Sequence, residues 1–582
     1  MVISYFIFRV SEGFKLLHLF FRFFILFIPL SLFAGTIDPN QPDPDAGRIL
    51  KEIEQLNKAI IPQTQDSLST YQEEENDKKG PSVTIKSFQI VGNEKLTIEQ
   101  IESFLSKFSK IPLTLNRIKK IPGALADFYN QQGFVAFVEI PDQDLTQGVL
   151  QLKITEGQFG GIEIIPQNGL SFVKPQLLEN FMTYNLPKGA INLKEIERRI
   201  GLINDLPGIK AKSALKAGNK AGEAKIGVLV TNNASRIGGL VTTDNYGSRA
   251  TGRERLLGSF RLDSPFYLGD QAQMTLLKSQ GVDYVRMDYS VPLGPLGWRV
   301  GPNFSFLQYD VVSQEFRSLK PRGKSYVYGL TAKYPLQRSP FTRSDVSFGY
   351  TERLFENKDN TNGLTSDYKI RVGNFGIRGD LADQWGLGGI NRYDFNIDIG
   401  RVDLNGSPNF SSDQSATGAR THGHYKKFSI DLNREQFLPQ DWSLFGKIYS
   451  QWADRNLDAS EKIYLGGPTA LRAYPTAEGA GNSGYLANFE VRKRLAQNFT
   501  LTGFYDLGHV RQFRDNYSNV SPNSYTLKGY GLMLAMNGPQ NTQLSLIVAD
   551  RVGENPNRTI SGTDQDGSKR DPFIWLRGAL YF

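Results

Sequence analysis

The chain has 582 residues, which is too long for one ordinary hydrophobic core, so several domains are expected. Its mean hydropathy is −0.35. Beyond the extreme N-terminus, no window holds the roughly twenty apolar residues that a spanning helix needs, which excludes a helical membrane protein. A net charge of +8 without a dense basic stripe gives no reason to expect a nucleic-acid partner. The absence of cysteine excludes thiol catalysis, thiolate metal sites and disulfide bonds.

The N-terminus has the pattern of a signal peptide. Arg9 and Lys15 precede an apolar run over residues 23–34, and a polar stretch begins at Gly35. This order predicts a signal peptide over residues 1–34 and export from the cytoplasm. A membrane anchor is the alternative, although the apolar run is short for a spanning segment.

A single amphipathic helix is predicted over residues 43–61. Asp45 is a suitable N-cap, and the intervening positions are largely charged. Such a helix is expected to lie against a partly polar surface or inside a wet channel. Residues 62–81 are polar and lack periodicity, which predicts a flexible linker. The apolar stripe has helical spacing and consists of Ala46, Ile49, Leu50, Ile53, Leu56 and Ile60.

Residues 82–234 predict two copies of one module, at 82–158 and 159–234, each in the order β-α-α-β-β. Gly133 is a candidate C-terminal stop for a helix. Helices on one sheet face leave strand edges free, which favours a docking site for an extended, unfolded client, with a plain spacer as the alternative. The first copy has strands 83–91, 134–140 and 149–154 and helices 97–108 and 115–132; the second has strands 162–165, 209–215 and 225–231 and helices 174–184 and 193–206.

Residues 235–582 alternate apolar and polar side chains in about sixteen short segments, which is typical of a transmembrane β-barrel with lipid outside and water inside. A soluble sandwich is the alternative. The outward sets predicted for three segments are Val285, Met287, Tyr289 and Val291; Tyr393, Phe395, Ile397 and Ile399; and Ile574, Leu576, Gly578, Leu580 and Phe582. The inward sets predicted for the first two are Arg286, Asp288 and Ser290, and Asp394, Asn396 and Asp398.

One connection, over residues 453–484, carries the most specific motif. Its run Gly466-Gly467-Pro468-Thr469-Ala470-Leu471-Arg472-Ala473-Tyr474-Pro475 sets a single arginine beside an aromatic residue after a glycine pair. An arginine inside a lumen needs a carboxylate partner, and Asp506 is the candidate.

These residues resemble the two-partner secretion transporters of Gram-negative outer membranes, the TpsB family of haemolysin activation/secretion type, within the outer-membrane assembly-factor superfamily. Leu471-Arg472-Ala473-Tyr474 is similar to the family's Val-Arg-Gly-Tyr/Phe signature on an inward-folded loop. Phe504, Asp506 and Gly508 match its Phe-x-Asp-x-Gly strand motif. At the barrel start, Asp244, Asn245 and Gly247 followed by Thr251 and Gly252 resemble its Asp-Asn-x-Gly and Thr-Gly pattern.

The resemblance covers nearly the whole chain and implies the architecture and the function. It implies a plug helix (43–61), two POTRA domains in the periplasm, and a sixteen-stranded barrel (235–582) with inward loop 453–484. It further implies a secreted exoprotein, of adhesin or haemolysin type, bound unfolded at the POTRA domains. The remaining expected partners are outer-membrane lipid and the barrel assembly machinery, for which Tyr581-Phe582 is the C-terminal signal. No cofactor, metal or catalysis is expected.

Two other functions share parts of this pattern. A factor that assembles other barrels has the same loop and modules but no place for the helix at 43–61, and a passive porin leaves the modules without a use. His422 and His424 lack a third ligand for a metal site. Asp564-Gln565-Asp566-Gly567 lacks the downstream glutamate of a calcium loop and is expected to be a solvated outer loop.

Overall fold

The computed structural model describes residues 44–60 and 82–582, except for short gaps at 144–146, 168, 170–171, 187–191, 218, 220–222, 234, 314–319, 360–364 and 518. The predicted signal peptide (1–34) and linker (62–81) lie outside the described residues. Among the helices that are described, none has the length and apolar character needed to cross a membrane.

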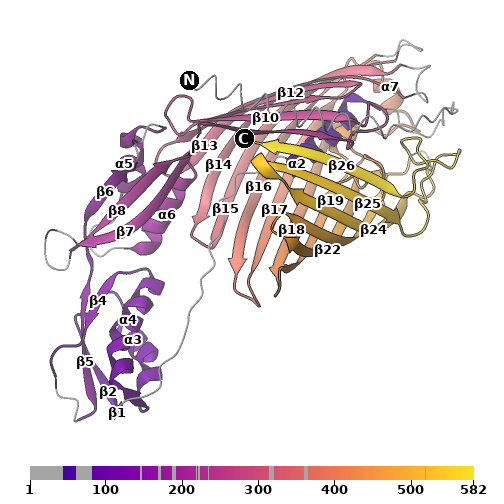
Figure 1. Cartoon of the computed structure of the whole chain (residues 1–582). Coiled ribbons are helices and arrows are strands. Elements are labelled where there is room, and N and C mark those ends of the chain that lie inside the picture. The colour runs from indigo at the N-terminus through magenta and orange to yellow at the C-terminus, as the bar shows by residue number, and fades with distance from the viewer. Residues whose placement is uncertain are drawn as a thin grey trace.

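Most of the described chain forms one closed antiparallel barrel (Figure 1). It closes through β26 on β9, which confirms the prediction of sixteen strands within the described residues. The strands are β9 (Ile237–Asp244), β10 (Arg255–Asp263), β11 (Gln271–Lys278), β12 (Val282–Leu293), β13 (Trp298–Asp310), β14 (Arg322–Arg338), β15 (Thr342–Lys358), β16 (Thr365–Asp383), β17 (Gly389–Asp403), β18 (Gly423–Phe437), β19 (Trp442–Ala453), β22 (Ser483–Ala496), β23 (Phe499–Arg511), β24 (Ser524–Asn537), β25 (Thr542–Arg551) and β26 (Phe573–Tyr581).

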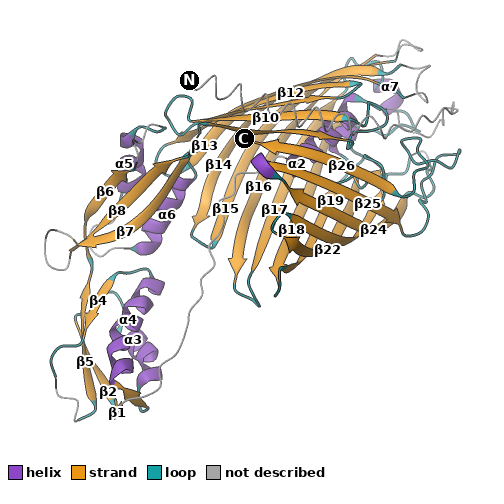
Figure 2. Cartoon of the chain, in the orientation of Figure 1, coloured by secondary structure: helices purple, strands orange, loops and turns teal. Residues whose placement is uncertain are grey.

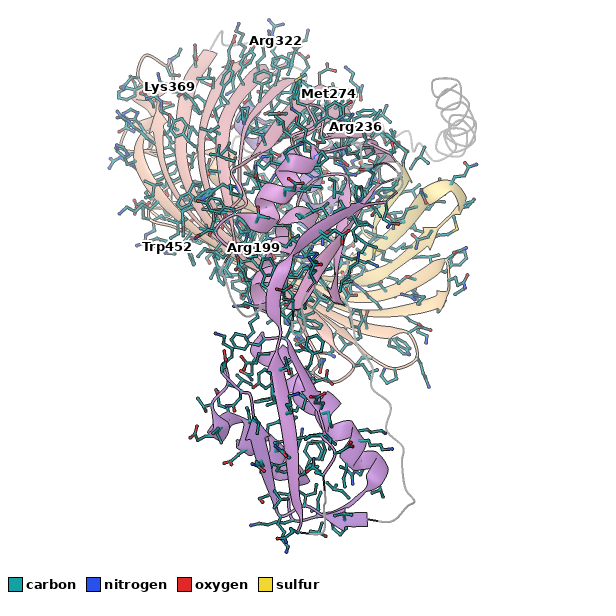
Figure 3. All side chains as sticks on the ribbon, turned by 90° about the vertical axis from the view of Figure 1, so that its left-hand side faces the viewer. Arg199, Arg236, Met274, Arg322, Lys369 and Trp452 are labelled. Atoms are coloured by element: carbon teal, nitrogen blue, oxygen red, sulfur yellow. The ribbon has the colours of Figure 1, made fainter. Side chains whose placement is uncertain are left out.

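The two faces of the barrel wall differ as the alternation predicts. On β17, Phe395, Ile397 and Ile399 are exposed on the outside, whereas Asp394 and its inward neighbours line a cavity in the lumen. On β26 the outward residue Ile574 is exposed, while the inward residues Phe573 and Trp575 are buried. Lys369 and Trp452 stand at the outer margin of the barrel in Figure 3. The exposed apolar residues on the outside suit lipid, whereas the inside combines polar residues around the cavity with apolar residues that pack against α2 and the inward loop.

The first of the two predicted modules precedes the barrel and differs in one respect from the prediction. The strand predicted over 83–91 is interrupted, because β1 pairs with β3 while β2 joins the sheet β2-β5-β4. Thr97 caps α3 with a capping box, and Gly133, at φ 93°, ends α4 as predicted. The elements are β1 (Ser82–Thr84), β2 (Ser87–Val91), α3 (Ile98–Leu105), η2 (Ser106–Phe108), β3 (Pro112–Thr114), α4 (Leu115–Gln132), β4 (Ala136–Glu139) and β5 (Val149–Glu156).

The second module packs directly on the barrel, as Figure 2 shows. Its α6 meets β14, where Arg338 binds Asp205 at 2.6 Å. At the start of the barrel, the guanidinium of Arg236 lies over the ring of Tyr267, 4.5 Å from its centroid. The elements are β6 (Gln158–Pro166), α5 (Pro175–Thr183), α6 (Leu193–Asn204), β7 (Ile209–Ala217) and β8 (Glu223–Asn232), with sheet order β6-β8-β7.

Two segments fill the lumen. Helix α2 (Ala46–Ile60), indigo in Figure 1, lies inside the ring of strands. The connection between β19 and β22 contains the short helix η4 (Ala459–Glu461) and the hairpin β20 (Ile463–Tyr464) and β21 (Ala480–Gly481). Buried residues of both segments join one hydrophobic cluster with the barrel wall. The remaining short helices, α7 (Phe410–Asp413) and η5 (Pro539–Asn541), lie in loops between strands.

Candidate functional site: the lumen of the barrel

The inward loop folds back sharply because of its glycines. Gly467 has a φ of 128°, which side chains rarely tolerate. A Cβ on Gly466 would stand 2.2 Å from the carbonyl oxygen of Pro475, so only glycine fits there. The glycine pair therefore allows the loop to pack tightly on itself.

Arg472 at the tip of this loop binds the carboxylate of Asp506 on β23. Its Nε donates to Oδ2 at 2.9 Å, its Nη2 donates to Oδ1 at 2.7 Å, and its backbone N–H also donates to Oδ2 at 3.1 Å. Arg472 is 5 % exposed and Asp506 is fully buried. This two-point geometry is the strongest form of an arginine–carboxylate contact. The structure therefore brings together the pair that the sequence singled out.

Three wall residues complete the surroundings of Arg472. Glu490 accepts a hydrogen bond from its Nη1 at 2.7 Å, and Asn488 donates to Asp506 at 2.8 Å. Phe504 lies under the guanidinium, 3.5 Å from ring centroid to Cζ. Sequence reasoning missed Glu490 and Asn488. Their alternation along β22 was available from the sequence, but the register that sets them opposite Phe504 and Asp506 was not.

Two glycines of the wall make room for the loop. A Cβ on Gly508 would stand 2.8 Å from Leu471, and a Cβ on Gly529 would stand 2.5 Å from the Cβ of Ala473. Ala473 has a negative φ, so alanine at this position of the signature causes no backbone strain. The following Tyr474 is fully buried, and its hydroxyl donates to the carbonyl oxygen of Lys528 at 3.2 Å.

The predicted barrel-start motif lies at the closing seam between β9 and β26. Asp244 is fully buried and receives both Nε and Nη2 of Arg255, at 2.8 and 3.0 Å. The Asn245 side chain bonds to the backbone of β26, donating to Ile574 O at 3.1 Å and accepting from Leu576 N at 2.9 Å. The motif thus fixes the first strand to the last.

The turn after β9 has no room for larger residues. A Cβ on Gly247 would stand 2.2 Å from the carbonyl oxygen of Gly252, and Gly252 itself has a φ of 100°. The carbonyl oxygen of Thr251 accepts hydrogen bonds from Gly281 N at 2.8 Å and from the Ser279 hydroxyl at 2.7 Å. The Thr-Gly pair therefore ties this turn to the next hairpin.

The inward loop and the seam, predicted separately, are in direct contact. Thr476 of the loop donates to the carbonyl oxygen of Tyr246 at 2.8 Å, and Trp575 of β26 donates to the carbonyl oxygen of Arg472 at 2.7 Å. The C-terminal residues lie further along the seam, where Tyr581 pairs with β9 and the backbone of Phe582 exchanges hydrogen bonds with Gly239. The loop anchor is thus tied to the strands that close the barrel.

Helix α2 is seated mainly by its apolar stripe. Ile49, Leu50 and Ile53 are buried against inward residues of the wall, including Tyr368. Asp45 accepts a hydrogen bond from Arg48 N at 2.8 Å, as expected of an N-cap. The N-terminal turn also packs on η4 of the inward loop, where a Cβ on Gly47 would stand 3.2 Å from the Cβ of Ser460.

The face of α2 that carries Lys51 and Lys58 borders a cavity, whereas Arg48 and Glu52 of the same helix form a buried ion pair at 3.0 Å. Lys58 reaches Asp394 on β17, with Nζ–Oδ2 at 3.2 Å, but its side chain is 62 % exposed. A cavity of about 230 Å³ separates this face from the wall. It is lined by Lys51, Lys58, Asn374, Asp394, Asn396, Asp398, Lys427, Ser429, Asp431 and Tyr449.

His422 and Asp564, from the two motifs considered for metal binding in the sequence, take part in local contacts. His422 Nδ1 accepts a hydrogen bond from Leu404 N at 3.1 Å, and its ring stacks edge-on against Phe410. Asp564 is 1 % exposed and receives Arg551 Nη1 at 2.9 Å, so the expectation of a solvated loop is wrong at this residue. Its carboxylate is buried because the loop after β25 folds against the inward loop, where Asn555 bridges Asp564 and Glu478.

The fold and the lumen define a class: an outer-membrane β-barrel transporter with periplasmic POTRA modules, an inward loop and a helix in its pore. Residues 222–534, more than half of the chain, match the family described as haemolysin secretion/activation protein ShlB/FhaC/HecB, and residues 83–157 match the POTRA domain of ShlB type. The chain belongs to this family of two-partner secretion transporters, which export partner exoproteins and are not enzymes.

Known proteins are similar to this chain over most of its length. The chain is 24% identical over 533 residues to the heme/hemopexin transporter protein HuxB of Haemophilus influenzae (strain ATCC 51907 / DSM 11121 / KW20 / Rd), covering 88% of this chain and 92% of that protein. It is 23% identical over 513 residues to the outer membrane transporter CdiB of Dickeya dadantii (strain 3937), covering 84% and 88%.

Solved structures show the same fold. CdiB from Escherichia coli matches with a TM-score of 0.66 at 19% identity, over 93% of this chain and 99% of that one. BamA from Haemophilus ducreyi lacking POTRA domains 1–3 matches with a TM-score of 0.51 at 13% identity, over 86% and 100%. The predicted family, fold class and outer-membrane location are confirmed.

Proposed function

We propose that this transporter receives its partner exoprotein unfolded, at the edges of its POTRA sheets, and passes it through the lumen after α2 has left. The observation that carries the proposal is the combination in one chain of a barrel with a helix inside it and two modules with free strand edges. A folded domain is too wide for a barrel of sixteen strands that also contains an inward loop.

The free edges favour recognition of the backbone. In the sheets β2-β5-β4 and β6-β8-β7, strands β2 and β6 are edges, and each lies beside a helix of its module. An extended segment added there gains main-chain hydrogen bonds without requiring a fixed sequence. The other edge of the second sheet, β7, carries Lys210, Lys212 and Lys216, a common protection against strand addition.

The inward loop is proposed to hold the barrel in a competent shape. Arg472 ties the loop to β23 through Asp506 and to β26 through Trp575. Binding of the partner shifts the population of α2 from inside the lumen to outside it, because the two compete for the same space. Folding of the exoprotein outside the cell then supplies the direction of transport.

The test is the fate of the partner exoprotein when the transporter is deleted. Export predicts that the exoprotein disappears from the medium while the other outer-membrane proteins keep their levels. A general loss of outer-membrane proteins would instead identify a barrel-assembly factor. Unchanged release of the exoprotein would reject the proposal.

A further inference from the structure

The inward loop has a second charged contact with the wall, away from Arg472. Glu461, the last residue of η4, is 1 % exposed, and its carboxylate lies between two cations of the wall. Arg353 of β15 donates to Oε1 through Nη1, and Lys427 of β18 donates to Oε2 through Nζ. These two strands stand six and three positions away from β23 in the order of the barrel. The base of the loop is therefore held on a different part of the wall from its tip.

The contact of Glu461 is completed by residues on two further strands. Lys427 Nζ also lies 3.1 Å from Asp398 Oδ2 on β17, and Gln451 Nε2 on β19 donates to the backbone carbonyl oxygen of Glu461 at 3.0 Å. A buried ion pair adds little net stability, because its charges lose their water on folding. It does favour one arrangement, since displacing either partner leaves the other buried and unpaired. The network therefore sets the position of η4 against the wall.

Helix α2 rests on the segment that Glu461 holds. Gly47 of the helix packs on η4, where an added Cβ would stand 3.2 Å from the Cβ of Ser460. Lys51 lies one turn further along the same face of the helix and lines the cavity together with Lys427. Its positive charge also interacts with the carboxylate of Glu461. The position of Glu461 thus affects the loop and the helix together.

We propose that Glu461 is a positioning residue of the closed pore, which holds η4 against β15 and β18 as the seat on which α2 rests. The inference rests on the part of the proposed function in which α2 leaves the lumen. Arg472 fixes the tip of the same loop through separate contacts with Asp506. The two anchors therefore have different roles: Glu461 governs how firmly α2 is seated, and Arg472 governs whether the barrel is competent for export.

Glu461→Gln separates these two roles. The substitution keeps the shape of the side chain but removes the charge that faces Arg353, Lys427 and Lys51. Single-channel openings in planar bilayers are expected to become about tenfold more frequent, within the range of coupling between two sites, while export of the exoprotein stays within about twofold of the parent. A residue needed only for the stability of the barrel would instead lower export and insertion together.

Asp380→Asn is the matched control in the wall. The carboxylate of Asp380 on β16 pairs with Arg392 on β17 at 3.4 Å, and parental openings and parental export are expected from the variant. Three outcomes overturn the proposal: a parental frequency of openings in Glu461→Gln, an equal rise in the control, or a loss of export in Glu461→Gln as large as that in Arg472→Ala.

A second variant covers the case in which Glu461→Gln fails to insert. Glu461→Gln/Lys427→Gln removes one charge of each sign, so the net charge of the lumen is that of the parent. This double variant is expected to insert and to open more often than the parent. A parental frequency of openings in the inserted double variant likewise overturns the proposal.

Deletion of residues 46–60 shows whether Glu461 acts through the helix. In the chain without α2, adding Glu461→Gln is expected to leave the current unchanged, because the seat is already empty. A further change of the current would overturn the inference, because Glu461 would then act on the barrel itself. A deletion that keeps the conductance of the parent refutes the departure of α2 in the proposed function instead, and a parent that exports no exoprotein refutes the transport.

Discussion

The inward loop and helix α2 occupy the same lumen but are held in different ways. The charge of Arg472 on the loop is sealed from water and bound at several points by Asp506 and Glu490. The charge of Lys58 on α2 meets one carboxylate across a wet cavity. Apolar burial holds α2 in place. The difference favours the inward loop as the fixed part of the lumen and α2 as the part that moves in the proposed mechanism.

Among the substitutions, Arg472→Ala is expected to lower export of the exoprotein most. Removing one partner of a buried ion pair costs about 3–5 kcal/mol because the remaining charges stay buried. Loss of most export is expected, measured as exoprotein in the medium, while heat-modifiable mobility shows that the barrel still inserts. Arg472→Lys keeps the charge but not the two-point contact and is expected to restore export only in part. Parental export by Arg472→Ala would remove the loop anchor from the mechanism.

Deleting residues 46–60, which form α2, tests whether this helix closes the pore. Because no strand of the barrel includes α2, insertion is expected to persist and single-channel conductance in planar bilayers to rise severalfold. A conductance equal to that of the parent would mean that α2 does not close the pore.

The sequence predicted which face of the barrel wall a residue lies on better than it predicted which residues of different strands contact one another. Period-two alternation placed Ile397 outside and Asp398 inside, because the side chains of a strand point to opposite faces wherever the strand lies. The pairing of Arg472 with Asp506 followed from the need of a buried arginine for a carboxylate. Glu490 and the space at Gly529 depend on the register of β22 and β24, which local pattern does not determine.

Gly529→Ala tests how tightly the inward loop packs against the wall, and its expected effect on export is smaller than that of Arg472→Ala. The new methyl group would stand 2.5 Å from the Cβ of Ala473, an overpacking that costs about 1–3 kcal/mol. A partial loss of export is expected from Gly529→Ala. Ala473→Gly alone should be tolerated, and combining the two changes should restore export. Failure of the second change to rescue the first would show that the two residues are not coupled.

Lys58→Gln has the smallest expected effect. An exposed ion pair contributes about 0–1 kcal/mol and is weakened by salt. Brief channel openings are expected to become more frequent at low salt and to match those of the parent in concentrated salt. Openings that increase equally at both salt concentrations would show that Lys58 acts through packing rather than charge.

The most direct test asks whether α2 moves away from the inward loop during export. The chain has no cysteine, so Gly47→Cys/Ser460→Cys introduces the only two thiols, at positions whose Cβ atoms would lie 3.2 Å apart, slightly closer than the roughly 3.5–4.5 Å of a disulfide. The account predicts that the oxidised double variant inserts but exports nothing, that a reductant in the medium restores export, and that each single cysteine variant exports as the parent does. Parental export with the disulfide formed would contradict the account, because α2 would then not need to leave its seat on the loop.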